Sequence, residues 1–270
     1  MALTDSLVSY WKLDETSGNA SDATSSVKTL TNVGTTAYAA AKINNGADFG
    51  ITNSTMYLTR TGYVVSDGAC SISFWVKQRT EISGGVQTFS FSGSESTALS
   101  VEYDFNAGTR RLQLTRIRSS LPTITTNYTI TLGTANFYHI VGTYDGANII
   151  LYVNGVSVGS TAASLNGTTN WSPGGGYFSI GANRSANDGS VSQYASAVID
   201  ESGIWNRAIT ATEVTNLYNS GFANAYPFIG YAMVATTTSF AIATQTANMF
   251  RGFLTNITKP ITTIINSLKT

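Results

Sequence analysis

Charged residues are scarce in this sequence. Only 11% of its 270 residues are charged, against about 25% in typical soluble domains. The 15 basic residues balance 15 acidic ones, so the composition shows no electrostatic attraction to nucleic acid or to an anionic membrane surface. We therefore expect no nucleic-acid partner. Ser, Thr, Asn and Gly fill the polar positions instead, which suits a protein that is packed among other proteins or lies outside the cell.

Cysteine and histidine are almost absent, with one residue of each. A single cysteine excludes an intramolecular disulfide. Cys70 begins the apolar run CSISFWV and has no basic neighbours, so a buried structural thiol is favoured over a reactive one. No nucleophile motif lies beside His139, which favours a structural role for it, and the sequence has no zinc-binding Cys/His cluster or phosphate-binding glycine loop.

Residues 138–160 predict a β-meander. Runs of alternating apolar and polar residues are joined at Asp145-Gly146 and again at Asn154-Gly155. Such a pair between alternating runs is the strongest short-range hairpin signal, because type I′ turns need positive φ at both central residues. We expect consecutive antiparallel strands here.

Further strands and one helix are predicted on either side of this meander. Residues 71–78, SISFWVKQ, alternate, so the aliphatic residues and Phe of this strand share one face. Residues 197–206 form the expected closing strand. Thr210 and Glu213 then make a capping box that starts a short helix, and Gly221 is expected to end it in the left-handed conformation.

Three segments resemble the laminin-G-like, concanavalin A-like jelly rolls, in the order typical of that family. The second segment lies within residues 138–160, YHIVGTYDG and LYVNG, and the third, IDESGIWNRAITATEVTNLYNSG, spans residues 199–221. The resemblance covers about residues 5–225. It implies an all-β fold, a two-sheet antiparallel jelly-roll sandwich of the concanavalin A-like type with one short helix and a C-terminal extension. The first of the three resembling segments lies near the N-terminus, and the residues in it that match the family are Tyr10, Trp11, Leu13, Asp14, Glu15, Gly18 and Asp22.

The resemblance ends near residue 225, which predicts a jelly-roll domain over residues 1–225 and a C-terminal arm over residues 226–270. No charged residue occurs between Asn216 and Phe250. Residues 228–250 are long enough to span a bilayer, but their Thr, Ser, Gln and Asn clusters insert poorly, so a membrane anchor is the disfavoured alternative. We expect an arm that docks on other protein subunits in a homo-oligomer or larger particle. Its candidate assembly residues are Phe228, Tyr231, Phe240, Phe250 and Phe253.

The resemblance also implies one structural Ca²⁺ between the loop after the first strand and the closing strand. Carboxylate oxygens are the ligands that Ca²⁺ requires. The ligands carried over by position are Asp14, Asp22 and Asp200, followed by Glu15 and Glu201. Alternatively, Glu201 or Asp200 pairs with Arg207 or caps a loop. The first loop departs from the family at Thr24-Ser25-Ser26, where Ser-Gly-Asn is usual.

Two polar loops carry the candidate glycan-binding residues, because loops at the rim of a sandwich carry function while its sheets carry packing. Aromatic rings stack on sugars and amides hydrogen-bond to them. In residues 166–176 the candidates are Asn170 and Trp171, and in residues 183–194 they are Asn183 and Tyr194. Alternatively, Trp171 anchors its loop.

An enzymatic function is not expected. Laminarinase-type members of this architecture carry an E-x-D-x-x-E string on one strand, whose carboxylates serve a retaining mechanism. Here Glu102 and Asp104 are followed by Ala107 in place of the last carboxylate. Two solvent-facing acids on a strand are the favoured interpretation, and a degenerate glycosidase is the alternative.

These patterns predict a non-enzymatic structural or adhesion protein, a jelly-roll module displayed on a larger assembly. The N-terminal residues show no basic segment followed by an apolar one, so no secretory signal is expected. A bacteriophage virion component is therefore favoured, either of the head decoration or of the tail. Such a protein would be made in the host cytoplasm and could also bind glycans. The alternative is a carbohydrate-binding domain of a secreted or cell-surface bacterial protein.

Overall fold

A computed structural model of the chain describes residues 1–51, 55–62, 68–80, 83–94, 97–118, 122–163, 176–184 and 190–228. The chain divides into a unit Met1–Phe228 and a unit Ile229–Thr270, and all described residues belong to the first. Several predicted residues lie outside the described ones: Asn170, Trp171, Tyr231, Phe240, Phe250 and Phe253.

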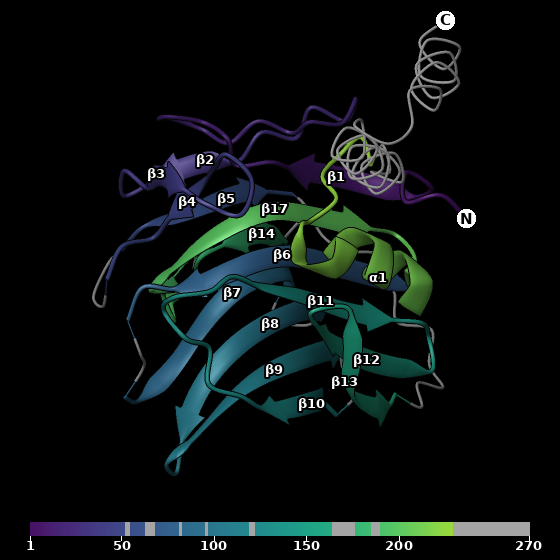
Figure 1. Ribbon diagram of the computed structural model, residues 1–270. Coiled ribbons are helices and arrows are strands. Elements are labelled where there is room, and N and C mark those ends of the chain that lie inside the picture. Colours follow the sequence, from purple (N-terminus) through teal and green to yellow (C-terminus); the bar gives the residue numbers. More distant parts are fainter. Residues whose placement is uncertain are drawn as a thin grey trace, which may run out of the picture. The chain divides into compact units, whose positions relative to one another are not determined.

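The predicted all-β fold is confirmed: the described residues form two large antiparallel sheets, a two-stranded sheet and one short helix (Figure 1). The strands are β1 Leu7–Trp11, β2 Thr31–Val33, β3 Ala37–Ala40, β4 Asn45–Asp48, β5 Tyr57–Thr61, β6 Cys70–Gln78, β7 Gly85–Ser94, β8 Thr97–Asn106, β9 Thr109–Arg118, β10 Ile124–Thr129, β11 Tyr138–Tyr144, β12 Asn148–Val153, β13 Val156–Ala162, β14 Tyr177–Ile180, β15 Asn183–Arg184, β16 Val191–Ser192 and β17 Ala197–Trp205. The helix α1 spans Ala211–Tyr218 and a 3₁₀ turn, η1, spans Asn219–Gly221.

The eight-stranded sheet has the order β13-β12-β11-β6-β17-β4-β3, with β1 also paired to β17. The seven-stranded sheet has the order β10-β9-β8-β7-β14-β5-β2, and among the described strands β15 pairs with β16 alone. The main core lies between the two large sheets, where Trp11 stacks on Phe178 with ring centroids 4.7 Å apart. Cys70 is buried in this core, as predicted for a structural thiol.

Strand β6 shows the predicted alternation. Ile72, Phe74 and Val76 belong to the main core, while Trp75 faces away from it. Both faces of the strand are nevertheless buried, because α1 lies against the outer face of the eight-stranded sheet and its Tyr218 stacks on Trp75 at 5.8 Å.

The two hairpin turns of the meander differ from each other. Asn154 and Gly155 both have positive φ, as the type I′ prediction requires. At the first turn only Gly146 has positive φ. There the Asp145 carboxylate accepts hydrogen bonds from the Ala147 and Asn148 amides, at 2.7 Å and 2.6 Å, so an Asx-type turn replaces the predicted type I′ turn.

The capping box at α1 is confirmed, with Thr210 as N-cap and Glu213 bonded back to it. Gly221 takes the predicted positive φ, 89°, at the end of the 3₁₀ turn, but α1 itself ends two residues earlier, where Asn219 is also left-handed and forms the C-cap. Its short amide side chain bonds to the Ala223 carbonyl at 3.0 Å, which stabilises that conformation locally.

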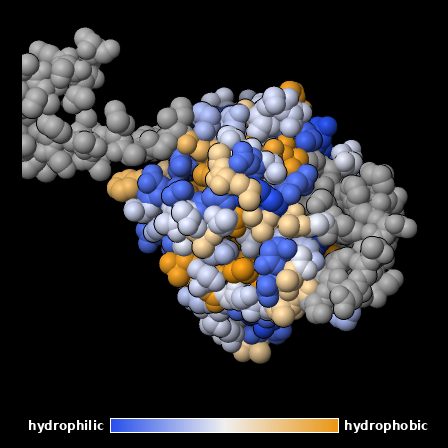
Figure 2. Space-filling view, turned by 90° about the vertical axis from the view of Figure 1, so that its right-hand side faces the viewer, coloured by the Kyte–Doolittle hydropathy of each residue, from blue (hydrophilic) through white to orange (hydrophobic). Residues whose placement is uncertain are grey.

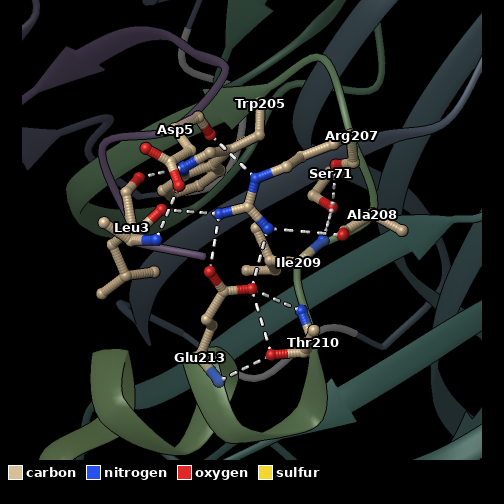
Figure 3. Close-up of polar contacts among 10 residues, drawn as sticks. Leu3, Asp5, Ser71, Trp205, Arg207, Ala208, Ile209, Thr210 and Glu213 are labelled. Carbon is tan, nitrogen blue, oxygen red and sulfur yellow. Dashed lines mark hydrogen bonds and ion pairs between the residues drawn. The ribbon is translucent and has the colours of Figure 1, made fainter.

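A second apolar cluster, defined by Leu3, Tyr10, Trp205, Val214 and Leu217 among others, joins the N-terminus to α1 on the outer face of the eight-stranded sheet. Figure 3 shows the polar contacts beside it, centred on Arg207. The space-filling view in Figure 2 shows hydrophilic and hydrophobic residues interspersed on one face of the molecule.

The cluster continues past the predicted domain end at residue 225. Phe228 packs edge-on against Tyr10 with ring centroids 5.3 Å apart, and Tyr226 lies 5.9 Å from the same ring. Phe228, predicted to serve assembly, therefore contacts the jelly roll itself. The first compact unit accordingly runs to Phe228, three residues beyond the point where the resemblance to the family ends.

Candidate glycan-binding site and candidate metal centre

A cavity of about 400 Å³ lies at the β2 and β5 edge of the seven-stranded sheet. Strand alternation supplies one wall, because Leu58 enters the core while its neighbours Tyr57 and Thr59 turn to the outer face. The antiparallel register places Thr31 opposite Thr59 and Val33 opposite Tyr57, so β2 extends the same wall. The cavity is thus lined by hydroxyl groups and an aromatic ring, and its remaining lining residues are Thr29, Arg60, Thr61 and Arg184.

Arg184 reaches the cavity from strand β15. Its guanidinium lies over the Tyr177 ring at 4.0 Å from the centroid, and its Nη1 donates to the Thr59 hydroxyl at 3.3 Å. The Nε of Arg184 is buried and has no hydrogen-bond partner among the described residues. These contacts fix the side chain while leaving donor capacity unused.

A second aromatic ring lies next to Tyr57. Tyr194 contacts it with ring centroids 6.2 Å apart and the planes inclined by 54°. Burial, followed by the neighbouring Tyr57, raises the pKa of Tyr194. The Tyr194 phenol therefore stays protonated at neutral pH and can donate a hydrogen bond.

Asn183 was predicted to contact a glycan, but its side chain serves the β15–β16 hairpin. Its amide donates to the Gln193 side chain at 3.1 Å, and Gln193 also accepts from the Thr88 hydroxyl at 2.9 Å. Asn183 does not line the cavity. The adjacent Arg184 does, and the sequence analysis missed it, although a lone arginine in a polar loop of a chain with few charges was a usable signal.

The predicted calcium ligands separate into two groups. Asp22 is fully engaged by its own loop, accepting from the Tyr10 and Lys28 amides and from both the amide and the hydroxyl of Thr24. Burial alone would raise its pKa, but the hydrogen bonds from Thr24 and Lys28 hold that pKa below its usual value. Glu15 likewise accepts from the Ser21 amide at 2.7 Å.

The other group, Asp14, Asp200 and Glu201, lies around a β-bulge in β17. The register of β17 against β6 shifts after Asp200, and Glu201 takes a positive φ of 50°. Asp200 is buried and accepts from the Ile43 and Glu201 amides. Burial, followed by the charge of Glu201, raises the pKa of Asp200 well above its ordinary value.

Glu201 is only 2% exposed, and no hydrogen bond of 3.5 Å or less reaches its carboxylate oxygens from the described residues, although the Tyr10 hydroxyl is close enough to lower its pKa. Burial and then the charge of Asp14 raise its pKa to about 7, against the opposing effects of Tyr10 and Lys12. No group of three or more His, Cys, Asp or Glu side chains in the described part of the chain is arranged to hold a metal ion. Calcium binding at the five predicted residues therefore stays a prediction.

The acids of the glycosidase alternative lie on the outer face of β8 without a catalytic partner. Glu102 accepts from the Ser100 hydroxyl at 3.0 Å, and burial raises its pKa despite that bond. Asp104 is held by Arg111 through two hydrogen bonds of 3.0 Å and 2.7 Å. Because Asp104 is paired with the Arg111 guanidinium, Glu102 lacks the second free carboxylate that a retaining mechanism needs.

A family model for the concanavalin A-like lectin/glucanases superfamily matches residues 49–215 of the sequence. The chain belongs to this superfamily. The matched range contains the meander and most of the closing segment, whereas the opening segment that resembles the family lies before it.

Several solved structures share this jelly-roll fold. Domain 4 of a GH43 extracellular arabinanase from Geobacillus stearothermophilus, in complex with arabinotriose, is 22% identical, with a TM-score of 0.57 over 78% of this chain and 97% of that domain. A structure of botulinum neurotoxin type C, whose cell entry depends on two ganglioside molecules, is 14% identical, with a TM-score of 0.62. The binding domain of Paraclostridial Mosquitocidal Protein 1 is 17% identical, with a TM-score of 0.58.

The alignments cover 80% and 82% of this superfamily member but only 51% and 53% of the two toxin chains. At these identities the likeness establishes the fold. No curated protein matches the sequence. Within the described residues, no helix is both long and apolar enough to cross a membrane.

Proposed function

We propose that the protein is a non-enzymatic carbohydrate-binding module whose sugar site is the cavity beside Tyr57. The observation that carries this proposal is the combination of the Tyr57 ring, threonine hydroxyl groups and the Arg184 guanidinium around a cavity of about 400 Å³. Its volume falls within the range of about 300–1,000 Å³ typical of small-molecule sites. An aromatic ring packs against the apolar face of a sugar ring while polar groups bond to its hydroxyls.

Two further observations support the proposal. The superfamily includes lectins, and the arabinanase domain with the same fold was solved with an oligosaccharide bound. The arrangement of Glu102 and Asp104 disfavours hydrolysis, because only one carboxylate is free of an ion pair. We therefore expect binding without turnover.

Replacing Tyr57 by alanine should reduce glycan binding at least tenfold, because it removes the ring that lines the cavity. The binding of full-length wild-type protein and Tyr57→Ala to a glycan array checks this. Phe222→Ala is the control, since Phe222 is an exposed aromatic residue that follows α1 and does not line the cavity. Equal binding by wild type and Tyr57→Ala would reject this cavity as the site, and a wild type that binds no glycan would reject the function.

We also propose that residues 229–270 tether the module to a larger assembly, such as the head decoration or tail of a bacteriophage virion. The support is in the sequence, whose residues 229–250 carry no charge. A secreted or cell-surface bacterial protein is the alternative, for which glycan binding would be the same and self-assembly would not be needed.

A chain ending at Phe228 should remain folded and become monomeric if the C-terminal segment mediates assembly. The cut belongs after Phe228 because Tyr226 and Phe228 pack on Tyr10. Light scattering of the full chain and of the truncated chain measures the two masses. A full chain that is itself monomeric would contradict the assembly role and leave the glycan-binding proposal intact.

A further inference from the structure

The cavity beside Tyr57 is elongated along strand β5. Alternation turns Tyr57, Thr59 and Thr61 to the same face of this strand, and all three residues line the cavity. Each residue of a strand adds about 3.4 Å, so the positions of Tyr57 and Thr61 are about 14 Å apart along β5. A lining of this length is longer than a single sugar ring.

Strand β2 carries a matching row of side chains. The antiparallel register sets Val33 opposite Tyr57 and, further along, Thr31 opposite Thr59. Thr29, two residues before Thr31, also lines the cavity. The cavity therefore has a direction, with an aromatic and an aliphatic side chain at one end and threonine hydroxyl groups over the remaining length.

The threonine hydroxyl groups differ in what they can bind. Thr59 is buried, and its hydroxyl donates to the Phe178 carbonyl at 3.0 Å and accepts from Arg184 at 3.3 Å. Thr31 and Thr61 are exposed. Thr59 thus positions the Arg184 guanidinium, while the hydroxyls of Thr31 and Thr61 are accessible to a ligand.

Two of the side chains that line the cavity are held in place by neighbouring rings. Tyr57 contacts the Tyr194 ring with centroids 6.2 Å apart, and the Arg184 guanidinium lies over the Tyr177 ring at 4.0 Å. Side chains that are already fixed lose little conformational entropy when a ligand binds. The stacking surface and one hydrogen-bond donor are therefore preorganised at different positions along β5.

Resting on the proposed function, we infer that the ligand is a linear oligosaccharide that lies along β5 and occupies three consecutive sites. The first sugar residue packs on Tyr57. The second bonds to Thr31 and Arg184, and the third bonds to Thr61. The protein thus recognises a stretch of a sugar chain rather than a single terminal sugar.

Isothermal titration of the full-length protein with sugar chains of increasing length tests the inference. The probes are arabino-, xylo- and cello-oligosaccharides of one to five residues, together with the oligosaccharides that bind on the glycan array and their shorter fragments. We expect the trisaccharide of at least one series to bind about tenfold more tightly than its monosaccharide, because each added residue gains at least one hydrogen bond. The affinity should then stay constant, since a fourth residue extends beyond the lining.

Thr61→Val should bind the trisaccharide about three- to tenfold more weakly than wild type, the usual effect of one lost hydrogen bond. It should bind the monosaccharide like wild type, because the substitution removes only the hydroxyl at the far end of the cavity. Thr129→Val is the matched control, since Thr129 is an exposed threonine on β10 at the other edge of the sheet. Thermal unfolding of each variant separates lost binding from lost folding.

Three results would overturn the inference and leave glycan binding intact. They are equal affinity for monosaccharide and trisaccharide in every series that binds, binding restricted to single terminal sugars, and wild-type affinity of Thr61→Val for the trisaccharide. If no sugar on the array or in the titration binds, the proposed function itself fails.

Discussion

Arg207→Ala should destabilise the protein by about 3–5 kcal/mol, the cost of breaking a buried ion pair by removing one partner. The guanidinium donates to both oxygens of Glu213, at 2.7 Å and 2.6 Å, and to the Asp5 and Ala2 carbonyls, at 2.8 Å and 2.9 Å (Figure 3). The side chains of Arg207 and Glu213 are only 11% and 7% exposed. The pair therefore joins the N-terminus, the end of β17 and the start of α1.

The loss is large because Glu213 would remain as a buried charge. Burial alone would raise the pKa of Glu213, but hydrogen bonds from Arg207 and Thr210 hold it below its usual value. Without Arg207 the carboxylate keeps only its bonds at the helix N-terminus. Chemical denaturation of the wild type and the variant measures the difference in the free energy of unfolding.

Arg79→Ala is the matched control for this measurement. Arg79 also forms an ion pair, with Asp48 at 2.9 Å, but its side chain is 42% exposed. Exposed ion pairs contribute about 0–1 kcal/mol. An Arg207→Ala variant that loses no more stability than Arg79→Ala would show that the buried network contributes little.

Glu201→Gln should stabilise the metal-free protein by about 1–3 kcal/mol at pH 8 and by much less at pH 5. The folded-state pKa of about 7 lies above the ordinary value of 4.5. An acid whose pKa is raised on folding contributes stability that is fully present below its unfolded pKa and is lost as the pH rises through the folded one. Wild type should therefore lose about 3 kcal/mol between pH 4.5 and pH 8 through this group, and the neutral amide removes that loss.

Thermal unfolding at pH 5 and pH 8, with a chelator present, measures this effect. Asp22→Asn should have the opposite effect and destabilise the protein at pH 8. The pKa of Asp22 is lowered in the folded state, and the substitution removes the hydrogen-bonded carboxylate from its loop. Adding calcium at pH 8 also tests the predicted ion: if it binds at Glu201, it should stabilise wild type more than Glu201→Gln. Equal stability of wild type and Glu201→Gln at pH 8 with chelator would contradict the buried-charge account.

Local sequence rules predicted the fold well because each acts over a few residues. The alternation in SISFWVKQ placed Ile72 and Phe74 in the core, and Thr210 with Glu213 marked the start of α1. The turn at Asp145 and the helix end at Asn219 were predicted less well. In both cases the glycine keeps its positive φ, but a short polar side chain that bonds to a nearby backbone group sets the geometry of the residues before it.

The candidate site was less predictable because it depends on contacts between distant segments. Tyr57 meets Tyr194, and Thr59 meets Arg184, across more than 120 residues of sequence. Of the predicted glycan-binding residues, Tyr194 contacts the cavity wall, whereas Asn183 bonds within its own hairpin. The positions of the acidic residues in the sequence likewise could not predict that Asp22 forms hydrogen bonds inside its own loop.

Chemical-shift mapping of the sugar site tests the central claim most directly. The full-length protein, labelled with ¹⁵N, is titrated with the tightest-binding oligosaccharide of the glycan array while its backbone amides are observed. The account predicts that the largest changes fall on β2, β5 and β15, at Thr31, Tyr57, Arg60 and Arg184. Changes confined to other surfaces, such as the outer face of β8 to β10, would contradict it.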